Sequence, residues 1–141
     1  MQAPLLAGNI LGSLHNSFTV AEWSDPGTPA GERHGPPRYI APLHVHHNDD
    51  EAWYVLEGAL CVQSGEERVE LQAGSGYLVP KGVPHTYWNP GSGRARYLLI
   101  MPPTILHLIQ QIHAMPERNP TALAAVFEQN GSSFLGWPND L

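Results

Sequence analysis

A short run before the middle of the chain holds the residues whose types and spacing best suit chemistry. His44 and His46 lie two positions apart in PLHVHHNDDEAWYVLEG, residues 42–58, and Glu51 follows them. In an extended strand, residues two apart point to the same face with Cβ atoms roughly 6–7 Å apart, so both imidazoles can converge on one ion. Because zinc and iron ions accept both imidazole nitrogen and carboxylate oxygen, Glu51 is a candidate third ligand.

Glu51 reaches the same face only if the strand is interrupted, because it lies five positions after His46. The intervening HNDD, residues 47–50, supplies the interruption, since Asn and Asp readily adopt turn conformations. Alternation from Glu51 then predicts that Trp53 and Val55 face the metal side. The residues expected to face away from that side, or to lie in the turn, are Ala52, Tyr54, Leu56, His47, Asp49 and Asp50.

A second segment, GSGYLVPKGVPHTYWN at residues 74–89, contains another strand histidine, His85. Tyr87 shares the face of His85 by alternation and is a candidate pocket residue, whereas Thr86 and Trp88 are expected to face away.

Together, the two segments resemble the two motifs of the cupin superfamily. The matching positions are His44, His46, Glu51 and Gly58 in the first segment, and Gly74, Pro80, Gly82, His85 and Asn89 in the second. The chain departs from the family pattern at Arg38, where the first motif begins with glycine. The resemblance implies a small antiparallel β-barrel of jelly-roll type that holds one divalent metal ion. The implied ligands are His44, His46, Glu51 and His85, a set that suits Fe, Mn, Ni, Co, Cu or Zn.

The elements that must position these residues are predicted to be mainly strands, which makes the fold class all-β. Between residues 39 and 101, short apolar or alternating runs are separated by Gly, Pro, Asn and Asp turns. An earlier strand is expected at 17–24, followed by a Gly/Pro-rich loop at 25–37 that is the best candidate for a mobile segment. We expect one domain over 1–141, with a barrel core at about 17–101.

A short helical tail is predicted at about 104–130. Ile105, Leu108, Ile109, Ile112 and Met115 follow helical spacing, and Pro116 ends that run. A second helix is indicated by Asn119 as N-cap, Pro120 at its first position, an apolar face of Leu123, Val126 and Phe127, and a stop at Gly131. We expect these amphipathic helices to cover the barrel or a dimer partner rather than to bind lipid.

Charge, apolar runs and cysteine content indicate which classes of protein are not expected. The formal net charge is −6 and the first lysine or arginine is Arg33, so the basic surface of a nucleic-acid-binding protein is not expected. No run approaches the ~20 apolar residues that cross a bilayer. The apolar residues 5–14 lack the basic start of a secretory signal, and the single Cys61 excludes an internal disulfide. These features predict a cytoplasmic protein, and the apolar strand faces favour a homodimer.

The site predicts metal-assisted chemistry on a small organic molecule. Four protein ligands leave one or two positions open on the ion, and Glu51 could also act as a base. Trp53, Val55 and Tyr87 would form the wall that orients a flat ligand. The longer pattern, with HHNDDEAWYVLEG and VPKGVPHTYWNPG, is similar to bacterial cupins of the quercetin dioxygenase-like kind, which implies a dioxygenase for a small enol, phenol or diketone.

Two alternatives remain open from the sequence. The first is a non-catalytic barrel that binds or senses a small ligand. The second is a sugar isomerase or epimerase, which would gain support if Lys81, Arg94 or Arg96 faced inward.

Overall fold

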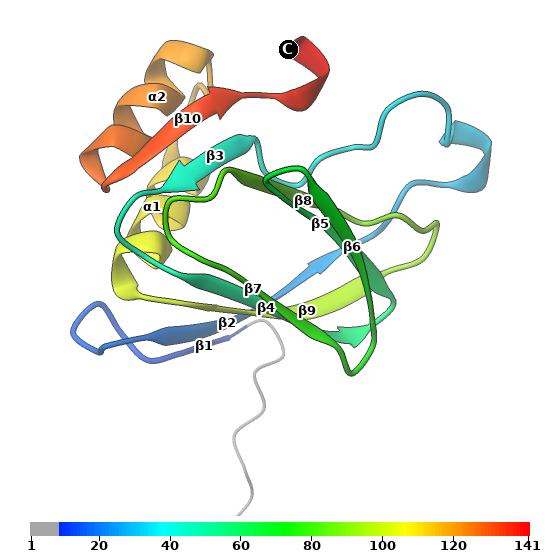
Figure 1. Cartoon of the computed structure of the whole chain (residues 1–141), viewed down its shortest axis with the longest axis horizontal. Helices are drawn as coiled ribbons and strands as arrows, with labels where there is room; N and C mark the ends of the chain where they lie inside the picture. Colours follow the sequence, from blue (N-terminus) through cyan, green and yellow to red (C-terminus); the bar gives the residue numbers. More distant parts are fainter. Residues whose placement is uncertain (1–8) are drawn as a thin grey trace, which may run out of the picture.

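The computed structural model describes residues 9–141, which form two antiparallel β-sheets and two α-helices (Figure 1). The strands are β1 (Ile10–Leu11), β2 (Thr19–Asp25), β3 (Leu43–His46), β4 (Glu51–Glu57), β5 (Ala59–Ser64), β6 (Glu67–Gln72), β7 (Gly76–Val79), β8 (His85–Trp88), β9 (Ala95–Met101) and β10 (Ser132–Gly136). The helices are α1 (Pro103–Ala114) and α2 (Pro120–Gln129), with short 3₁₀ turns η1 (Ala30–Glu32) and η2 (Pro138–Asp140).

The strands are arranged in two five-stranded sheets, with orders β1-β2-β9-β4-β7 and β10-β3-β8-β5-β6. Figure 1 shows the two sheets facing each other. The predicted all-β, antiparallel fold of jelly-roll type is confirmed. The sheets stay separate, however, so the fold is a sandwich of two sheets and not a barrel closed by hydrogen bonds.

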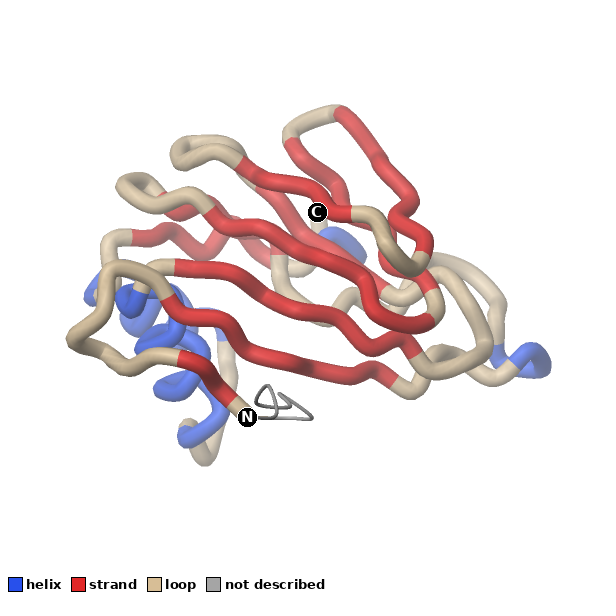
Figure 2. Tube along the Cα trace, turned by 90° about the horizontal axis from the view of Figure 1, so that it is seen from below, coloured by secondary structure: helices blue, strands red, loops and turns tan. Residues whose placement is uncertain are grey.

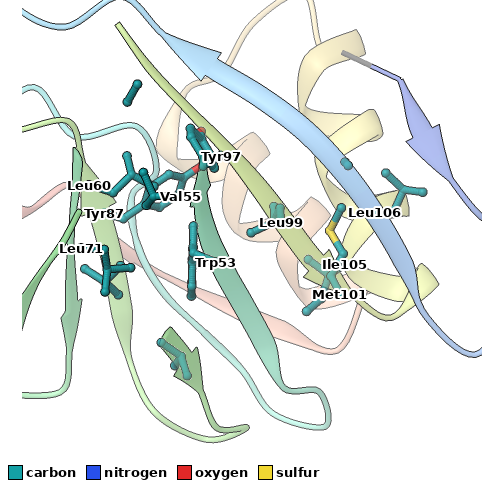
Figure 3. Close-up of a cluster of buried hydrophobic side chains, with 14 residues drawn as sticks. Trp53, Val55, Leu60, Leu71, Tyr87, Tyr97, Leu99, Met101, Ile105 and Leu106 are labelled. Carbon is teal, nitrogen blue, oxygen red and sulfur yellow. The ribbon is translucent and has the colours of Figure 1, made fainter. Parts of the chain in front are cut away.

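The hydrophobic core lies between the sheets because each strand presents alternate residues to the inside. In β4, Trp53 and Val55 are buried, whereas Tyr54 and Leu56 are exposed, as the alternation predicted. Tyr97 of β9 pairs in register with Val55 on one side and with Trp23 of β2 on the other. Figure 3 shows Trp53, Val55, Tyr87 and Tyr97 among the clustered core side chains.

All four residues of strand β8 are buried, including Thr86 and Trp88, which were expected to face away from the side of His85. Thr86 Oγ1 donates a hydrogen bond of 2.7 Å to the carbonyl oxygen of Ala41. Trp88 packs edge-on against Tyr39, with ring centroids 5.3 Å apart. The segment before β3 runs beside β8, since Tyr39 forms an antiparallel bridge with Trp88 and the Ile40 N–H donates to the Tyr87 carbonyl oxygen. Its residues contact the outward side chains of β8.

Both predicted helices are present. α1 begins at Pro103, and α2 begins after Asn119, whose side chain accepts a hydrogen bond from the backbone N–H of Ala122 at 2.9 Å. Their apolar faces pack on the sandwich and on each other through Leu108, Leu123 and Phe127. Figures 1 and 2 show the helices at one end of the sheets and η1 at the other. The expectation that they cover the sheets is confirmed.

Two strands were not predicted. β1 is a short edge strand beside β2, and β10 follows α2 and pairs with β3. The turn into β10 uses Gly131, whose φ of 71° lies in the left-handed region. This last strand places Ser132 opposite His46 in register, so the C-terminal segment contributes directly to the surroundings of the histidines.

Two positions of the first motif have clear structural roles, one through the backbone and one through a side chain. Gly58 has a φ of 75°, and a Cβ there would lie 2.5 Å from the carbonyl oxygen of Arg94, so only glycine fits. Arg38, which replaces the expected glycine, donates hydrogen bonds to the carbonyl oxygen of Gly27 at 2.8 Å and to Thr28 Oγ1 at 3.1 Å. Arg38 thus ties the loop after β2 to the segment before β3.

No helix within residues 9–141 has both the length and the apolar character needed to cross a lipid bilayer. Residues 5–8, part of the segment tested above as a secretory signal, lie outside the described residues.

Candidate metal centre

Four side chains from three strands meet between the two sheets. His44 and His46 come from β3, His85 comes from the neighbouring β8, and Glu51 comes from β4 in the facing sheet. His44 pairs directly with His85 in the sheet, and their ring centroids are 4.3 Å apart. All four residues are buried, and one candidate ligand atom from each lies within 4.8 Å of the others.

The three imidazoles are oriented by hydrogen bonds at Nδ1. His44 Nδ1 lies 2.6 Å from the carbonyl oxygen of Pro42, and His85 Nδ1 lies 3.0 Å from that of Val83. A carbonyl oxygen can only accept, so both Nδ1 atoms carry the proton and both Nε2 atoms present a lone pair. His46 Nδ1 lies 2.7 Å from Ser132 Oγ, and this hydroxyl can either accept the Nδ1 proton or donate its own.

The Nε2 atoms of His46 and His85 are buried and have no hydrogen-bond partner among the described residues. Buried polar atoms of this kind normally have partners, and the cost of leaving them unpaired is appreciable. Both atoms point toward the Glu51 carboxylate, at 3.4 Å from His46 and 3.5 Å from His85. The lone pair of His85 Nε2 is available to a cation, as is that of His46 Nε2 in the tautomer that donates Nδ1–H to Ser132.

The electrostatics of the centre favour an ionised Glu51 and a neutral His44. Burial by itself raises the pKa of Glu51, but the adjacent His46 and His85 side chains hold its pKa well below the ordinary value. Burial, followed by the neighbouring His85 and His46, lowers the pKa of His44 well below 6.5. Glu51 therefore offers a negative oxygen ligand and His44 a neutral nitrogen ligand, the protonation states that metal coordination requires.

The donor set fits a divalent transition metal. Nitrogen and oxygen ligands lie at ~2.0–2.2 Å from zinc, so ligands on opposite sides of one ion are about 4.2 Å apart. The observed spread of up to 4.8 Å is close to that limit, and small side-chain shifts would bring the four atoms onto one ion. The buried His/Glu cluster is thus compatible with metal binding.

Two residues that were not predicted from the sequence support the histidines. Ser132 of β10 holds His46, and Phe127 of α2 packs against the His44 ring with centroids 5.3 Å apart. The alternating run after Gly131 was the only local signal of β10, and it is short. Nothing in the sequence indicates which strand β10 joins.

A cavity of about 310 Å³ adjoins the metal centre. His44, His46 and Glu51 contribute to one part of its wall. The rest is mainly apolar and comes from both sheets and from the two helices, including Leu99, Ile105, Leu108, Ile109, Leu123 and Phe127. Arg118, in the connection between α1 and α2, is exposed and also lines the cavity. An organic molecule in this space would lie beside the four candidate ligands.

Of Trp53, Val55 and Tyr87, which were expected to line the ligand pocket, only Tyr87 lines the cavity. Tyr87 lines the cavity together with Tyr97, and their hydroxyl oxygens are 2.9 Å apart. Trp53 and Val55 face the interior but are not part of the cavity wall in the present arrangement. Trp53 instead packs against His85 and Tyr87, with centroid distances of 5.7 and 5.3 Å. Direct contact of Trp53 and Val55 with a ligand stays a prediction.

The remaining polar residues near the first motif lie outside the cluster. His47 is exposed and its Nε2 lies 2.7 Å from Ser133 Oγ, while Asp50 is exposed and accepts a hydrogen bond from the backbone N–H of Lys81. Lys81, Arg94 and Arg96 do not line the cavity. Arg94 and Arg96 form ion pairs with Glu57, and Arg96 also pairs with Glu22.

Comparison with known proteins agrees with this fold. Residues 34–101 match the family model described as the cupin domain. The chain is 29% identical over 85 residues to the HTH-type transcriptional regulator PuuR of Escherichia coli strain K12. That match covers 60% of this chain and 40% of PuuR, so the chain spans well under half the length of this curated relative.

Solved structures of other proteins resemble the fold of this chain. The TT1209 protein of Thermus thermophilus superposes with a TM-score of 0.50 and 26% identity, over 62% of this chain and 73% of that protein. A cupin protein from Bacteroides fragilis superposes with a TM-score of 0.54 and 16% identity, over 72% of this chain and 82% of that protein. The family match and these structural likenesses support the cupin superfamily.

Proposed function

We propose that this chain is a cupin that binds one divalent metal ion and uses it to hold a small organic ligand. The metal ligands in this proposal are His44, His46, Glu51 and His85. The observation that carries it is the pair of buried, unpartnered Nε2 atoms of His46 and His85 beside a buried carboxylate. An apolar cavity next to these atoms supports an organic ligand.

The proposed reaction is dioxygenation of a small enol, phenol or diketone. A bound divalent metal would supply Lewis acidity and a place where the substrate and O₂ can be brought together. Glu51 would accept the proton of the enol or hydroxyl group on a carboxylate oxygen, because it is the buried carboxylate that borders the cavity. The apolar wall would orient the flat part of the substrate and exclude water.

The test combines metal analysis with oxygen consumption. Purified protein should contain close to one equivalent of a transition metal, and it should consume O₂ with a member of a panel of enols, phenols and diketones. The same panel under anaerobic conditions is the control, because a dioxygenase then gives no product. A metal-loaded protein that turns over no panel compound in air would contradict the enzymatic part of the proposal.

A non-catalytic sensing role is the second candidate, and the likeness to a transcriptional regulator favours it. In that case the metal and cavity would capture a ligand without changing it. The panel compounds would then raise the melting temperature of the metal-loaded protein and be recovered intact. A sugar isomerase is less well supported, because Lys81, Arg94 and Arg96 all lie outside the cavity wall.

We also propose that the chain forms a homodimer through the outer face of the β1-β2-β9-β4-β7 sheet. Leu78 is 54% exposed there and Tyr54 is 41% exposed, and they flank the partly exposed Ala52 of β4. An apolar face of this kind is a common interface between copies. Light scattering after size exclusion should give twice the chain mass, and Leu78→Lys should shift it toward the monomer.

A further inference from the structure

The hydroxyl groups of Tyr87 and Tyr97 form a buried pair whose hydrogen bonding is incomplete. Their oxygens are 2.9 Å apart, and the residues are 8% and 2% exposed. Phenols have pKa values of about 10, so both hydroxyls carry a proton at neutral pH. One O–H donates to the other oxygen, and the second proton then needs an acceptor outside the pair.

No acceptor for that second proton is present among the described residues, where each hydroxyl has only the other as partner. Both tyrosines contribute to the cavity wall, and most of that wall is apolar. A buried O–H group without an acceptor is costly in such surroundings. The pair is therefore a donor site beside a space large enough for a small molecule.

The pair also lies close to the candidate metal centre. Tyr87 and His85 are two positions apart on β8 and share its inner face, which separates their Cβ atoms by roughly 6–7 Å. Trp53 packs against both rings and fixes their relative positions. Tyr97 is held from the facing sheet by its neighbours Val55 and Trp23 in β4 and β2. A single small molecule can thus reach both the metal ligands and the hydroxyl pair.

We propose that the Tyr87–Tyr97 hydroxyl pair donates a hydrogen bond to an oxygen of the ligand. The cavity then selects planar, mostly apolar ring compounds that carry a carbonyl or similar acceptor oxygen, in preference to hydrocarbons of the same shape. This inference deepens the proposed function by naming the ligand class, and it assigns Tyr97 as a further binding residue. It needs no covalent step.

The test uses two probes of nearly identical shape, acetophenone and α-methylstyrene, which differ in C=O against C=CH₂. Each is titrated into ¹⁵N-labelled protein as purified, and the dissociation constant is taken from amide shifts of residues that line the cavity. The Tyr87→Phe/Tyr97→Phe double variant should bind acetophenone about five-fold more weakly, the effect of one neutral hydrogen bond. Its affinity for α-methylstyrene should stay within about two-fold of wild type.

The double variant is the informative one, because either tyrosine left alone could still donate its own proton. Tyr54→Phe is the matched control: it removes a phenol hydroxyl from the exposed outer face of β4 and should change neither dissociation constant. A cooperative melting transition in each variant shows that the fold is retained. The inference is overturned if the double variant weakens both probes equally, or if neither probe gives saturable shifts at the cavity.

The titrations are repeated on protein stripped of metal with a chelator. A five-fold loss for acetophenone in the stripped double variant supports the donor pair even if no metal is found in the purified protein. The converse outcome is that the protein binds metal while the double variant loses no more affinity for acetophenone than for α-methylstyrene. That result leaves the proposed metal site intact and overturns the inference about the tyrosines.

Discussion

His46 and Ser132 are 86 residues apart in the chain and are joined by a hydrogen bond of 2.7 Å between Nδ1 and Oγ. The bond exists because β10 pairs with β3 in a register that sets the two residues opposite each other. Partners of this kind orient a histidine and fix the nitrogen that faces a metal. The last strand therefore takes part in preparing the candidate metal centre.

Ser132→Ala should weaken metal binding by about ten-fold, the lower end of the range found for the loss of such partners. The physical reason is that His46 loses the group that holds its ring and favours one tautomer. Competition with a chromogenic chelator for a metal such as Zn²⁺ or Co²⁺ measures the change. Ser133→Ala is the matched control, because the neighbouring hydroxyl contacts the exposed His47 instead. Equal losses in both variants would contradict the positioning role of Ser132.

His85→Ala should abolish stoichiometric metal binding, because it removes one of the four candidate ligands and its orphaned Nε2 atom. Metal content measured by plasma mass spectrometry should fall from about one equivalent to background. His47→Ala removes a histidine next to the cluster that points to the surface, and it should retain the full metal content. A His85→Ala protein that keeps its metal would exclude this ligand set.

Much of the candidate centre was predictable because its signals are local. Alternation in a strand decides which residues share a face, so the common side of His44 and His46 follows from their spacing. The interruption at residues 47–50 is likewise encoded by the local Asn and Asp residues. The two helices followed from apolar spacing together with the cap at Asn119.

The parts that could not be predicted depend on contacts between distant segments. The role of Ser132 needs the pairing of β10 with β3, and the donor pair needs Tyr87 and Tyr97 to approach from facing sheets. The burial of Trp88 depends on coverage by the segment around Tyr39. Local propensity carries no information about such registers. The two separate sheets, in place of the expected closed barrel, also depend on pairing between distant segments.

Acid should destabilise the metal-free protein from about neutral pH downward. Burial keeps His44 neutral in the folded state, so its pKa lies below the unfolded value of 6.5. Between those two pKa values the unfolded chain binds more protons, and the free energy of unfolding falls by up to about 1.4 kcal/mol per pH unit for this group. Glu51 adds a further loss below its unfolded pKa of 4.5, because its folded pKa is also lowered.

Urea denaturation of chelator-treated protein at pH 8, 7, 6 and 5 measures this dependence. The free energy of unfolding should be steady above pH 7 and should fall at lower pH. The His44→Gln variant provides the comparison, since an amide cannot take up a proton in the unfolded chain, and its slope between pH 7 and 5 should be smaller. Parallel curves for the two proteins would show that His44 is not the group responsible.

The hydroxyl pair of Tyr87 and Tyr97 should give a non-additive pattern in stability. Tyr97→Phe leaves the buried Tyr87 hydroxyl without its partner, and Tyr87→Phe does the same to Tyr97, so each should cost about 1–2 kcal/mol. The double variant removes both polar groups while keeping both rings, and it should be at least as stable as either single variant. Chemical denaturation of the four proteins completes the cycle. A double variant destabilised by the sum of the two single losses would mean that the hydroxyls act independently and are not a coupled pair.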